Sequence, residues 1–354
     1  MNNLVVYLFV FANTYVHGAR FNTCATGEVC KPQNECEAVM KITSKGGWTP
    51  QERAYLKSKH CNYVNRLNHF CCASDTKPDH LPEAPKCGIY FGDRIVNGED
   101  TNIDEFPWFA LIQYSKPGNR IGHNCGGSLI NDQYVLTAAH CKILVPKTWK
   151  ITKVRLGEWD MRTNPDCQED FCNDRYVEVP VVNILVHPEY YFEGVAQYHD
   201  IAILKLGRKV EFSNWIKPIC LPVDARIRSM DFTSHSLEVV GFGLTETGFT
   251  SPVKKKVELD GRTQAECQAQ YNKAGVRIFE KHFCAGSENG KDSCNGDSGS
   301  PLMKFGNFPH SKFGHYMQVG LVSFGARRCG TPDSSGVYVR VSEYMDWIIE
   351  NTKY

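Results

Sequence analysis

The stretch Asp292-Ser-Cys-Asn-Gly-Asp-Ser-Gly-Ser-Pro301 places one serine, Ser298, between two glycines and directly after a carboxylate. A serine hydroxyl is an effective nucleophile only when a base takes its proton and nearby donors stabilise the oxyanion. Flanking glycines permit a sharp turn, in which main-chain N–H groups can point at a substrate carbonyl. Because glycine-rich turns are common, this stretch is a catalytic candidate only if the chain also supplies a histidine and a second aspartate.

Two upstream segments supply these groups. Thr137-Ala-Ala-His140-Cys141 follows an apolar strand, and His199-Asp200-Ile-Ala-Ile-Leu begins another. A lone histidine is most often structural, and a lone aspartate before a strand is most often a turn residue or a cap. Taken together, in the order His, Asp, Ser, the three segments favour a nucleophilic serine with its base and its orienting carboxylate.

Length, charge and the N-terminus limit the other possibilities. A chain of 354 residues has room for roughly two domains. Its net charge of +1 favours neither nucleic acid nor an acidic membrane surface. Residues 4–11 form an apolar run followed by small residues, which predicts a signal peptide over 1–18, cleaved near Gly18. The run is too short to span a bilayer, so we expect a soluble, secreted protein.

The chain has sixteen cysteines, which in an exported protein predict disulfides before metal ligands. The sequence has no Cys-x-x-Cys pair and no His-Glu-x-x-His motif, so no zinc site is expected. Six of the cysteines lie within residues 24–72. Such a small segment cannot bury enough apolar surface to be stable alone, which predicts three disulfides in one of fifteen possible pairings. This module has no plausible catalytic group, so we expect it to serve in docking or regulation rather than as a spacer.

The remaining segments differ in character. Thr49-Pro-Gln-Glu52 predicts a helix start inside the small module. Residues 73–94 are rich in proline and mixed charge, which predicts an exposed linker and activation segment that proteases can cut. Residues 95–354 contain short β-branched and aromatic runs separated by turn residues, typical of an all-β domain. Residues 342–350 predict a C-terminal helix capped by Ser342.

Taken together, these motifs resemble those of a known protein family. Residues 95–354 resemble the chymotrypsin–trypsin family at Ile95-Val-Asn-Gly, at the His140 and Asp200 segments and at Gly296-Asp-Ser-Gly. Residues 24–72 resemble the clip module that precedes such domains in arthropod immune and developmental proteases. The resemblance implies two six-stranded antiparallel β-barrels with the active site between them. It also implies that His140 is the general base, Asp200 orients it, Ser298 is the nucleophile, and the N–H groups of Gly296 and Ser298 form the oxyanion hole.

The resemblance further implies a specificity pocket and an activation step. Asp292 at the pocket base would favour Arg or Lys, because an unpaired buried carboxylate is costly. The pocket walls would be Gly325 and Gly336, and the segment from Ser323 to Gly325 would pair with the substrate backbone. Cleavage between Arg94 and Ile95 would free an α-amino group that pairs with Asp297, so the chain as given is a zymogen.

Disulfides and a calcium loop are implied as well. The implied pairs are Cys24–Cys71, Cys30–Cys61, Cys36–Cys72, Cys87–Cys220, Cys125–Cys141, Cys167–Cys172, Cys267–Cys284 and Cys294–Cys329. Glu158 lies where calcium-binding members begin a calcium loop, with Asp174 as a second candidate ligand. The alternative is a solvated acidic loop held by its disulfide. No cofactor is expected to be required for catalysis.

The expected function is therefore a secreted clip-domain serine endopeptidase of a haemolymph cascade, in Toll-ligand processing, prophenoloxidase activation and melanisation, or clotting. Its expected partners are an upstream activating protease, a downstream zymogen or pro-ligand and serpin inhibitors. One alternative is a catalytically inactive homologue that acts as a binding cofactor, which the presence of Ser298 disfavours. Another is a digestive trypsin, which the clip module and Cys87 disfavour. Ser300 and Phe242 depart from the family's usual glycine and tryptophan.

Overall fold

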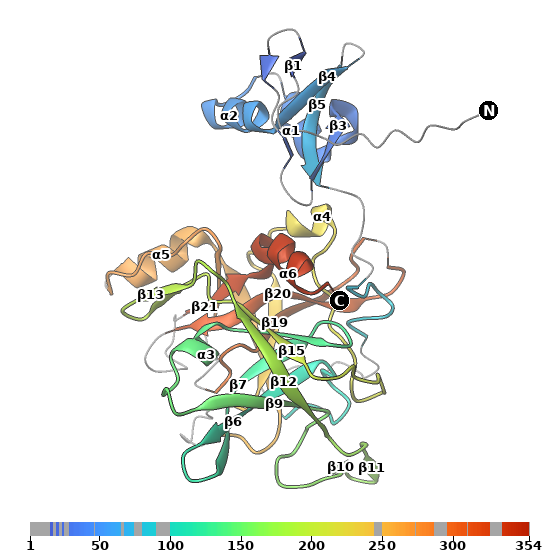
Figure 1. The fold of residues 1–354 in the computed structure, drawn as a ribbon, viewed down its shortest axis with the longest axis vertical. Coiled ribbons are helices and arrows are strands. Elements are labelled where there is room, and N and C mark those ends of the chain that lie inside the picture. Colours follow the sequence, from blue (N-terminus) through green and yellow to red (C-terminus); the bar gives the residue numbers. More distant parts are fainter. Residues whose placement is uncertain are drawn as a thin grey trace, which may run out of the picture. The chain divides into compact units, whose positions relative to one another are not determined.

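The computed structural model describes residues 15–16, 19–20, 23–24, 28–45, 47–64, 67–73, 80–89, 100–243, 250–272, 274–286, 296–309, 311–325 and 335–353. The chain divides into two compact units, residues 1–77 and 78–354, whose elements are labelled in Figure 1. The predicted cleavage site Arg94–Ile95, the predicted pocket residue Asp292 and the pair Cys294–Cys329 lie outside the described residues. Within the described residues, no helix has both the length and the apolar character needed to cross a bilayer.

The first unit is built on an antiparallel sheet of three strands in the order β3-β5-β4. Its small apolar core includes Val39, Leu56 and Phe70. Because so few residues are buried, three disulfides supply much of the constraint on this unit. The elements are β1 (Tyr15–Val16), β2 (Ala19–Arg20), β3 (Glu28–Pro32), the 3₁₀ turn η1 (Gln33–Glu35), α1 (Glu37–Thr43), α2 (Pro50–Lys59), β4 (His60–Val64) and β5 (Leu67–Ala73).

The helix start predicted at Thr49 is confirmed. The Glu52 N–H donates to the Thr49 hydroxyl (3.2 Å), and the Thr49 N–H donates to the Glu52 carboxylate (2.8 Å). This reciprocal pair satisfies two backbone donors that helix geometry leaves without partners, and Pro50 occupies the first turn, where no N–H is needed.

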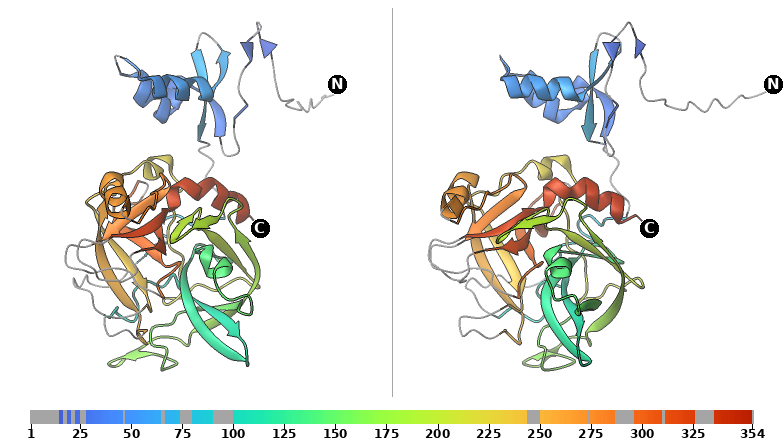
Figure 2. Two further views of the ribbon diagram at one scale, coloured as in Figure 1. Left: turned by 90° about the vertical axis from the view of Figure 1, so that its left-hand side faces the viewer. Right: turned by 60° about the vertical axis from the view of Figure 1, so that its left-hand side comes forward.

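The second unit consists of two closed antiparallel barrels of six strands each, as expected. The first barrel contains β6 (Phe109–Lys116), β7 (Arg120–Leu129), β8 (Tyr134–Thr137), β9 (Lys150–Leu156), β12 (Val177–Val186) and β15 (Ala202–Leu206). The second contains β16 (Ser236–Gly241), β17 (Lys255–Arg262), β18 (His282–Gly286), β19 (Pro301–Gly306), β20 (His315–Phe324) and β21 (Ser335–Arg340). Both views of Figure 2 show the green barrel beside the yellow-to-red one.

The barrel strands carry fully buried apolar residues. In β15, Ile203 and Leu204 are fully buried, and in β8 so is Leu136. Closure pairs every edge strand and leaves no free row of backbone donors and acceptors. The remaining elements lie in connections: α3 (His140–Ile143), β10 (Cys167–Gln168), β11 (Phe171–Cys172), β13 (Tyr191–Glu193), β14 (Ala196–Tyr198), α4 (Ala225–Arg228), α5 (Gln264–Asn272), the 3₁₀ turn η2 (Val341–Tyr344) and α6 (Met345–Asn351).

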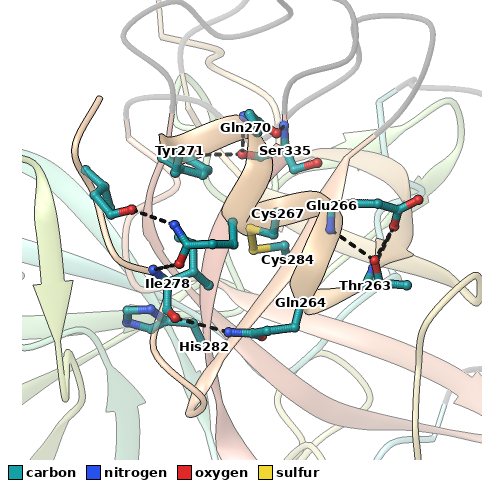
Figure 3. The surroundings of a disulfide bond; sticks show 12 residues. Thr263, Gln264, Glu266, Cys267, Gln270, Tyr271, Ile278, His282, Cys284 and Ser335 are labelled. Atoms are coloured by element: carbon teal, nitrogen blue, oxygen red, sulfur yellow. Dashed lines mark hydrogen bonds between the residues drawn. A yellow bond between two sulfur atoms is a disulfide. The ribbon is translucent and has the colours of Figure 1, made fainter. Parts of the chain in front are cut away.

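Two helices differ from the sequence prediction. The C-terminal helix starts as the 3₁₀ turn η2, and neither η2 nor α6 has a side-chain cap, so the expected Ser342 cap is wrong. The helix α5 was not predicted. Its signal was present, because Thr263 and Glu266 form a capping box, with the Thr263 N–H donating to Glu266 (2.9 Å) and the Glu266 N–H donating to Thr263 (3.2 Å), as drawn in Figure 3.

The segment 80–89 is not the exposed linker that its prolines suggested. Leu81 and Cys87 are buried in the second unit, at 4% and 0% exposure. Cys87 is bonded to Cys220, and the Gly88 backbone exchanges hydrogen bonds with Pro218 (2.9 Å) and Tyr316 (2.8 Å). A disulfide and backbone pairing therefore hold this segment against the second barrel.

Candidate active site

Two paired strands of the first barrel bring His140 and Asp200 together. His140 opens α3, three residues after β8, and Asp200 lies two residues before β15, which pairs with β8. The Asp200 carboxylate is fully buried and accepts hydrogen bonds from the His140 backbone N–H (2.8 Å) and from His140 Nδ1 (2.7 Å). The carboxylate therefore selects the imidazole tautomer with hydrogen on Nδ1, which leaves Nε2 as a proton acceptor.

The Asp200 carboxylate accepts a hydrogen bond from a third donor. The Ser323 hydroxyl, near the end of β20 in the second barrel, donates to Asp200 Oδ2 at 2.5 Å. A buried carboxylate is costly unless donors compensate the lost hydration, and three donors do so here. The sequence analysis placed Ser323 only in a substrate-pairing segment and missed this contact. Nothing local could have shown it, because 123 positions separate the two residues.

The electrostatics of the pair are coupled. Burial by itself would lower the pKa of His140, but the charge of Asp200 and its hydrogen bond outweigh burial, so the pKa lies above its ordinary value. Burial would raise the pKa of Asp200, but the charge of His140 and the hydrogen bonds from His140 and Ser323 hold it below its ordinary value. The site therefore favours a negative carboxylate and stabilises a positive imidazole beside it.

The Ser298 turn lies against the histidine-bearing segment of the first barrel. The Ser298 carbonyl accepts a hydrogen bond from the Gly126 N–H (2.9 Å). Gly299 has φ = +76°, and a Cβ there would collide with Thr137 and lie 3.0 Å from the Ala138 nitrogen. Only glycine fits this close approach, which brings Ser298 to the segment that ends in His140.

Backbone hydrogen bonds hold the shape of the Ser298 turn. Gly299 donates to the Val322 carbonyl (3.0 Å) and Ser300 donates to the Asp297 carbonyl (2.9 Å). These bonds hold the turn without using the N–H groups of Gly296 and Ser298, the predicted oxyanion donors. Gly296 has φ = +104°, where a Cβ would lie 2.9 Å from the Gly243 Cα, so the turn needs glycine there as well.

The carboxylate before the nucleophile lies in a narrow space. Asp297 Oδ1 accepts a hydrogen bond from the Gly243 N–H (2.9 Å). A Cβ on either Gly241 or Gly243 would collide with the Asp297 carboxylate. The two glycines therefore make room for this group, the residue that the sequence identified as the activation partner.

The described residues of the predicted pocket are two glycines and Ser323. A Cβ built on Gly325 would lie 3.8 Å from the Gly336 Cα, so the two residues that the sequence placed in the pocket walls are neighbours. Ser323 lies in the same region, at a register shift where β20 meets β21. Of the predicted pocket residues, these three are brought together.

Of the two predicted calcium ligands, Glu158 is buried and Asp174 is exposed. Glu158 is 3% exposed, and its Oε2 accepts a hydrogen bond from Arg155 (2.8 Å). Its Oε1 has no hydrogen-bond partner among the residues that the structure describes. Burial raises the pKa of Glu158 against that hydrogen bond, and the charge of the buried Asp166 adds to the increase. An unpartnered buried carboxylate oxygen suits a hard cation, but Arg155 already supplies positive charge to Glu158.

Two residues depart from the family pattern beside this turn. Ser300 is fully buried, and its hydroxyl has no hydrogen-bond partner among the described residues. Phe242 is buried against Phe109, with ring centroids 5.7 Å apart. Neither residue takes part in the hydrogen bonds between His140 and Asp200.

Seven disulfides are present among the described cysteines, and each is one of the pairs that the resemblance implied. They are Cys24–Cys71, Cys30–Cys61, Cys36–Cys72, Cys87–Cys220, Cys125–Cys141, Cys167–Cys172 and Cys267–Cys284. The bond Cys125–Cys141 joins β7 to the residue after His140, so it anchors the segment that carries His140.

Comparison with known proteins agrees with this geometry. The family profile "Trypsin" matches residues 95–348, and "Regulatory CLIP domain of proteinases" matches residues 25–72. The chain is 37% identical over 363 residues to CLIP domain-containing serine protease B4 of Anopheles gambiae, with 99% of each chain covered. It is 40% identical over 377 residues to Melanization protease 1 of Drosophila melanogaster, with 94% of each covered.

A solved structure shows the same similarity. The crystal structure of the Drosophila Grass clip serine protease of the Toll pathway superposes with a TM-score of 0.68 at 29% identity. The match covers 94% of this chain and 97% of that one. Together with the buried His140–Asp200 pair, the Ser298 turn and the two barrels, these matches show that the chain belongs to the family of trypsin-like serine proteases that carry a clip domain.

Proposed function

We propose that this chain is the zymogen of a secreted serine endopeptidase that cleaves after Arg or Lys in an extracellular proteolytic cascade. The observation that carries the proposal is the arrangement of three groups. One barrel holds His140 against the buried carboxylate of Asp200, while the turn before β19 of the other barrel brings Ser298 to the same segment. These are a base, its orienting group and a nucleophile.

The chemistry follows from this arrangement. His140 Nε2 takes the hydroxyl proton as Ser298 Oγ attacks the carbonyl carbon of the peptide bond. The oxyanion that forms accepts hydrogen bonds from the N–H groups of Gly296 and Ser298. The imidazolium then gives its proton to the leaving amine, and an acyl-enzyme remains. Water repeats the sequence through the same base and releases the acid. Throughout, Asp200 stabilises the positive imidazole.

The activation step uses Asp297. Cleavage after Arg94 creates a new α-amino group on Ile95, which we propose pairs with the Asp297 carboxylate. In the uncut chain this carboxylate accepts from the Gly243 N–H and is bordered by Gly241 and Gly243. A cation reaching this position would fix the residue that precedes the nucleophile, and with it the oxyanion donors.

Specificity for a basic side chain rests on Asp292. The neighbouring glycines Gly325 and Gly336 leave room for a long side chain, and a carboxylate at the pocket base would pair with its charge. The proposed place in a cascade rests on the relatives, one named for melanisation and another described as part of the Toll pathway. An upstream protease, a protein zymogen or pro-ligand substrate and serpin inhibitors are the proposed partners in haemolymph.

The test is to cut purified full-length chain after Arg94 and measure hydrolysis of peptide amides that end in Arg, Lys or Phe. We expect turnover of the Arg and Lys substrates and none with Ser298→Ala. Turnover of the Phe substrate alone would refute the role of Asp292. No turnover of any substrate by the cut protein would instead favour an inactive homologue that acts by binding.

A further inference from the structure

A second cluster of coordinating side chains lies beside the catalytic aspartate. Nitrogen atoms of His187 and His199 and a carboxylate oxygen of Glu189 all lie within 4.8 Å of one another. His187 directly follows β12, Glu189 is in the next turn, and His199 lies between β14 and Asp200. The two imidazoles stack nearly parallel with centroids 5.1 Å apart, so one ring must rotate before both can direct a nitrogen lone pair at one ion. Glu189 Oε2 is 3.8 Å from His199 Nδ1.

The cluster is open to solvent on the side of Glu189, and its nitrogens make only long hydrogen bonds. The Glu189 side chain is 68% exposed, whereas that of His199 is 12% exposed. His187 Nδ1 faces the Glu189 backbone N–H at 3.2 Å, and His199 Nδ1 faces the Tyr344 hydroxyl at 3.2 Å. Both are long, neutral hydrogen bonds, so an arriving metal ion can replace them at small cost.

The donor set selects the ion. Two imidazole nitrogens and one carboxylate oxygen, with a fourth position for water, are a common ligand set for Zn²⁺. Hard cations such as Ca²⁺ and Mg²⁺ prefer oxygen ligands alone. The ammonium of Lys281 lies 5.4 Å from the centre of the Tyr344 ring and is the positive charge that opposes a bound cation.

The cluster is mechanically connected to the catalytic pair. His199 has φ = +52°, a backbone conformation uncommon outside glycine, and its carbonyl accepts from the Ile201 N–H at 2.8 Å. Residues 199–201 therefore form a tight turn around Asp200. A metal ion that rotates the His199 side chain toward His187 therefore pulls on this turn, next to the carboxylate that is hydrogen-bonded to His140.

We propose that His187, Glu189 and His199 form a Zn²⁺ site, and that its occupation slows hydrolysis by displacing Asp200 from His140. The inhibitory part rests on the proposed endopeptidase function, whereas the binding part does not. The sequence predicted no zinc site, because it contains none of the short-spaced zinc motifs. Here the pairing of β13 with β14 returns the chain and brings His199 beside His187.

Binding is tested on the full-length Ser298→Ala chain, with Zn²⁺ measured by calorimetry and Co²⁺ as the spectroscopic probe. We expect one ion per chain and the visible bands of four-coordinate Co²⁺. His187→Gln and Glu189→Gln should each weaken binding at least about tenfold. His235→Gln, at an exposed histidine outside the cluster, is the matched control and should leave binding unchanged. Lys281→Met should tighten binding.

Absence of stoichiometric binding, or binding that persists in His187→Gln, would overturn the site. Inhibition is tested on chain cut after Arg94, with each variant compared in Zn²⁺ with its own rate in chelator. We expect Zn²⁺ to lower kcat more than it changes KM, and both cluster substitutions to relieve the effect. Unchanged kcat in zinc-saturated protein would overturn the inhibitory role. If the cut protein is inactive even in chelator, the proposed function fails, while the Co²⁺ spectra still decide the metal site.

Discussion

The buried hydroxyl of Ser300 offers a direct test of the packing beside the nucleophile. Ser300 has no exposed surface, and its Oγ has no hydrogen-bond partner within the part of the chain that the structure describes. Its backbone, in contrast, is fully used, since the N–H donates to Asp297 and the carbonyl accepts from Val322. Ser300→Ala removes only the hydroxyl and leaves this backbone pairing in place.

The expected change in stability follows from two opposing contributions. A buried polar group without a partner costs about 1 to 3 kcal/mol, because its hydration is lost and not replaced. Removing the oxygen leaves a space smaller than a methyl group, which costs less than about 1 kcal/mol. We therefore expect Ser300→Ala to raise the free energy of unfolding by about 1 kcal/mol, or the melting temperature by about 2 to 4 °C.

The matched control is Ser128, which is equally buried but donates to Gln318 Oε1 at 2.6 Å. Ser128→Ala leaves that amide oxygen without its donor and should destabilise the protein by about 1 to 3 kcal/mol. Both substitutions are compared by scanning calorimetry in the Ser298→Ala background, which prevents self-digestion. If Ser300→Ala lowers the melting temperature as much as Ser128→Ala does, the Ser300 hydroxyl has a partner and the reasoning is wrong.

Three further predictions follow from the described contacts, and a fourth follows from the implied calcium loop. Because the pKa of His140 is raised above 6.5, kcat/KM should fall as the pH decreases through a value above 6.5, where the base becomes protonated. Asp200→Asn removes the charge that raises the His140 pKa, so burial should then lower this pKa and shift the acidic limb of the pH–rate profile to lower pH. The same substitution should lower kcat about 10⁴-fold. An acidic limb at unchanged pH would contradict the assignment of the raised pKa to the Asp200 charge. After cleavage at the activation site, the two chains should stay joined on non-reducing gels and separate on reducing gels, and substituting Cys87 and Cys220 by serine should separate them under both conditions. The calcium loop implied by the resemblance predicts that calcium raises the melting temperature and that Glu158→Gln removes this increment; equal melting temperatures in calcium and in chelator would favour the disulfide-held acidic loop instead.

Parts of this protein could be predicted because their signals are local in the chain. The segments around His140, Asp200 and Ser298 each combine a reactive side chain with a characteristic neighbourhood, and the short apolar runs predict strands. The α2 start could be predicted for the same reason, since a capping box spans four residues. The α5 capping box at Thr263 and Glu266 is an equally local signal, although it lies within a pattern that otherwise favours strands.

The sequence alone therefore determined the fold class, the chemical groups and their order along the chain. The tertiary structure decided which groups meet and which are left without partners. Ser323 became a donor to Asp200 only because the two barrels bring their strand ends together. Leu81 and Cys87 became buried through a disulfide to the second barrel. These outcomes depend on contacts between residues far apart in the chain, and the free energy of such a contact is set by three-dimensional packing rather than by local sequence.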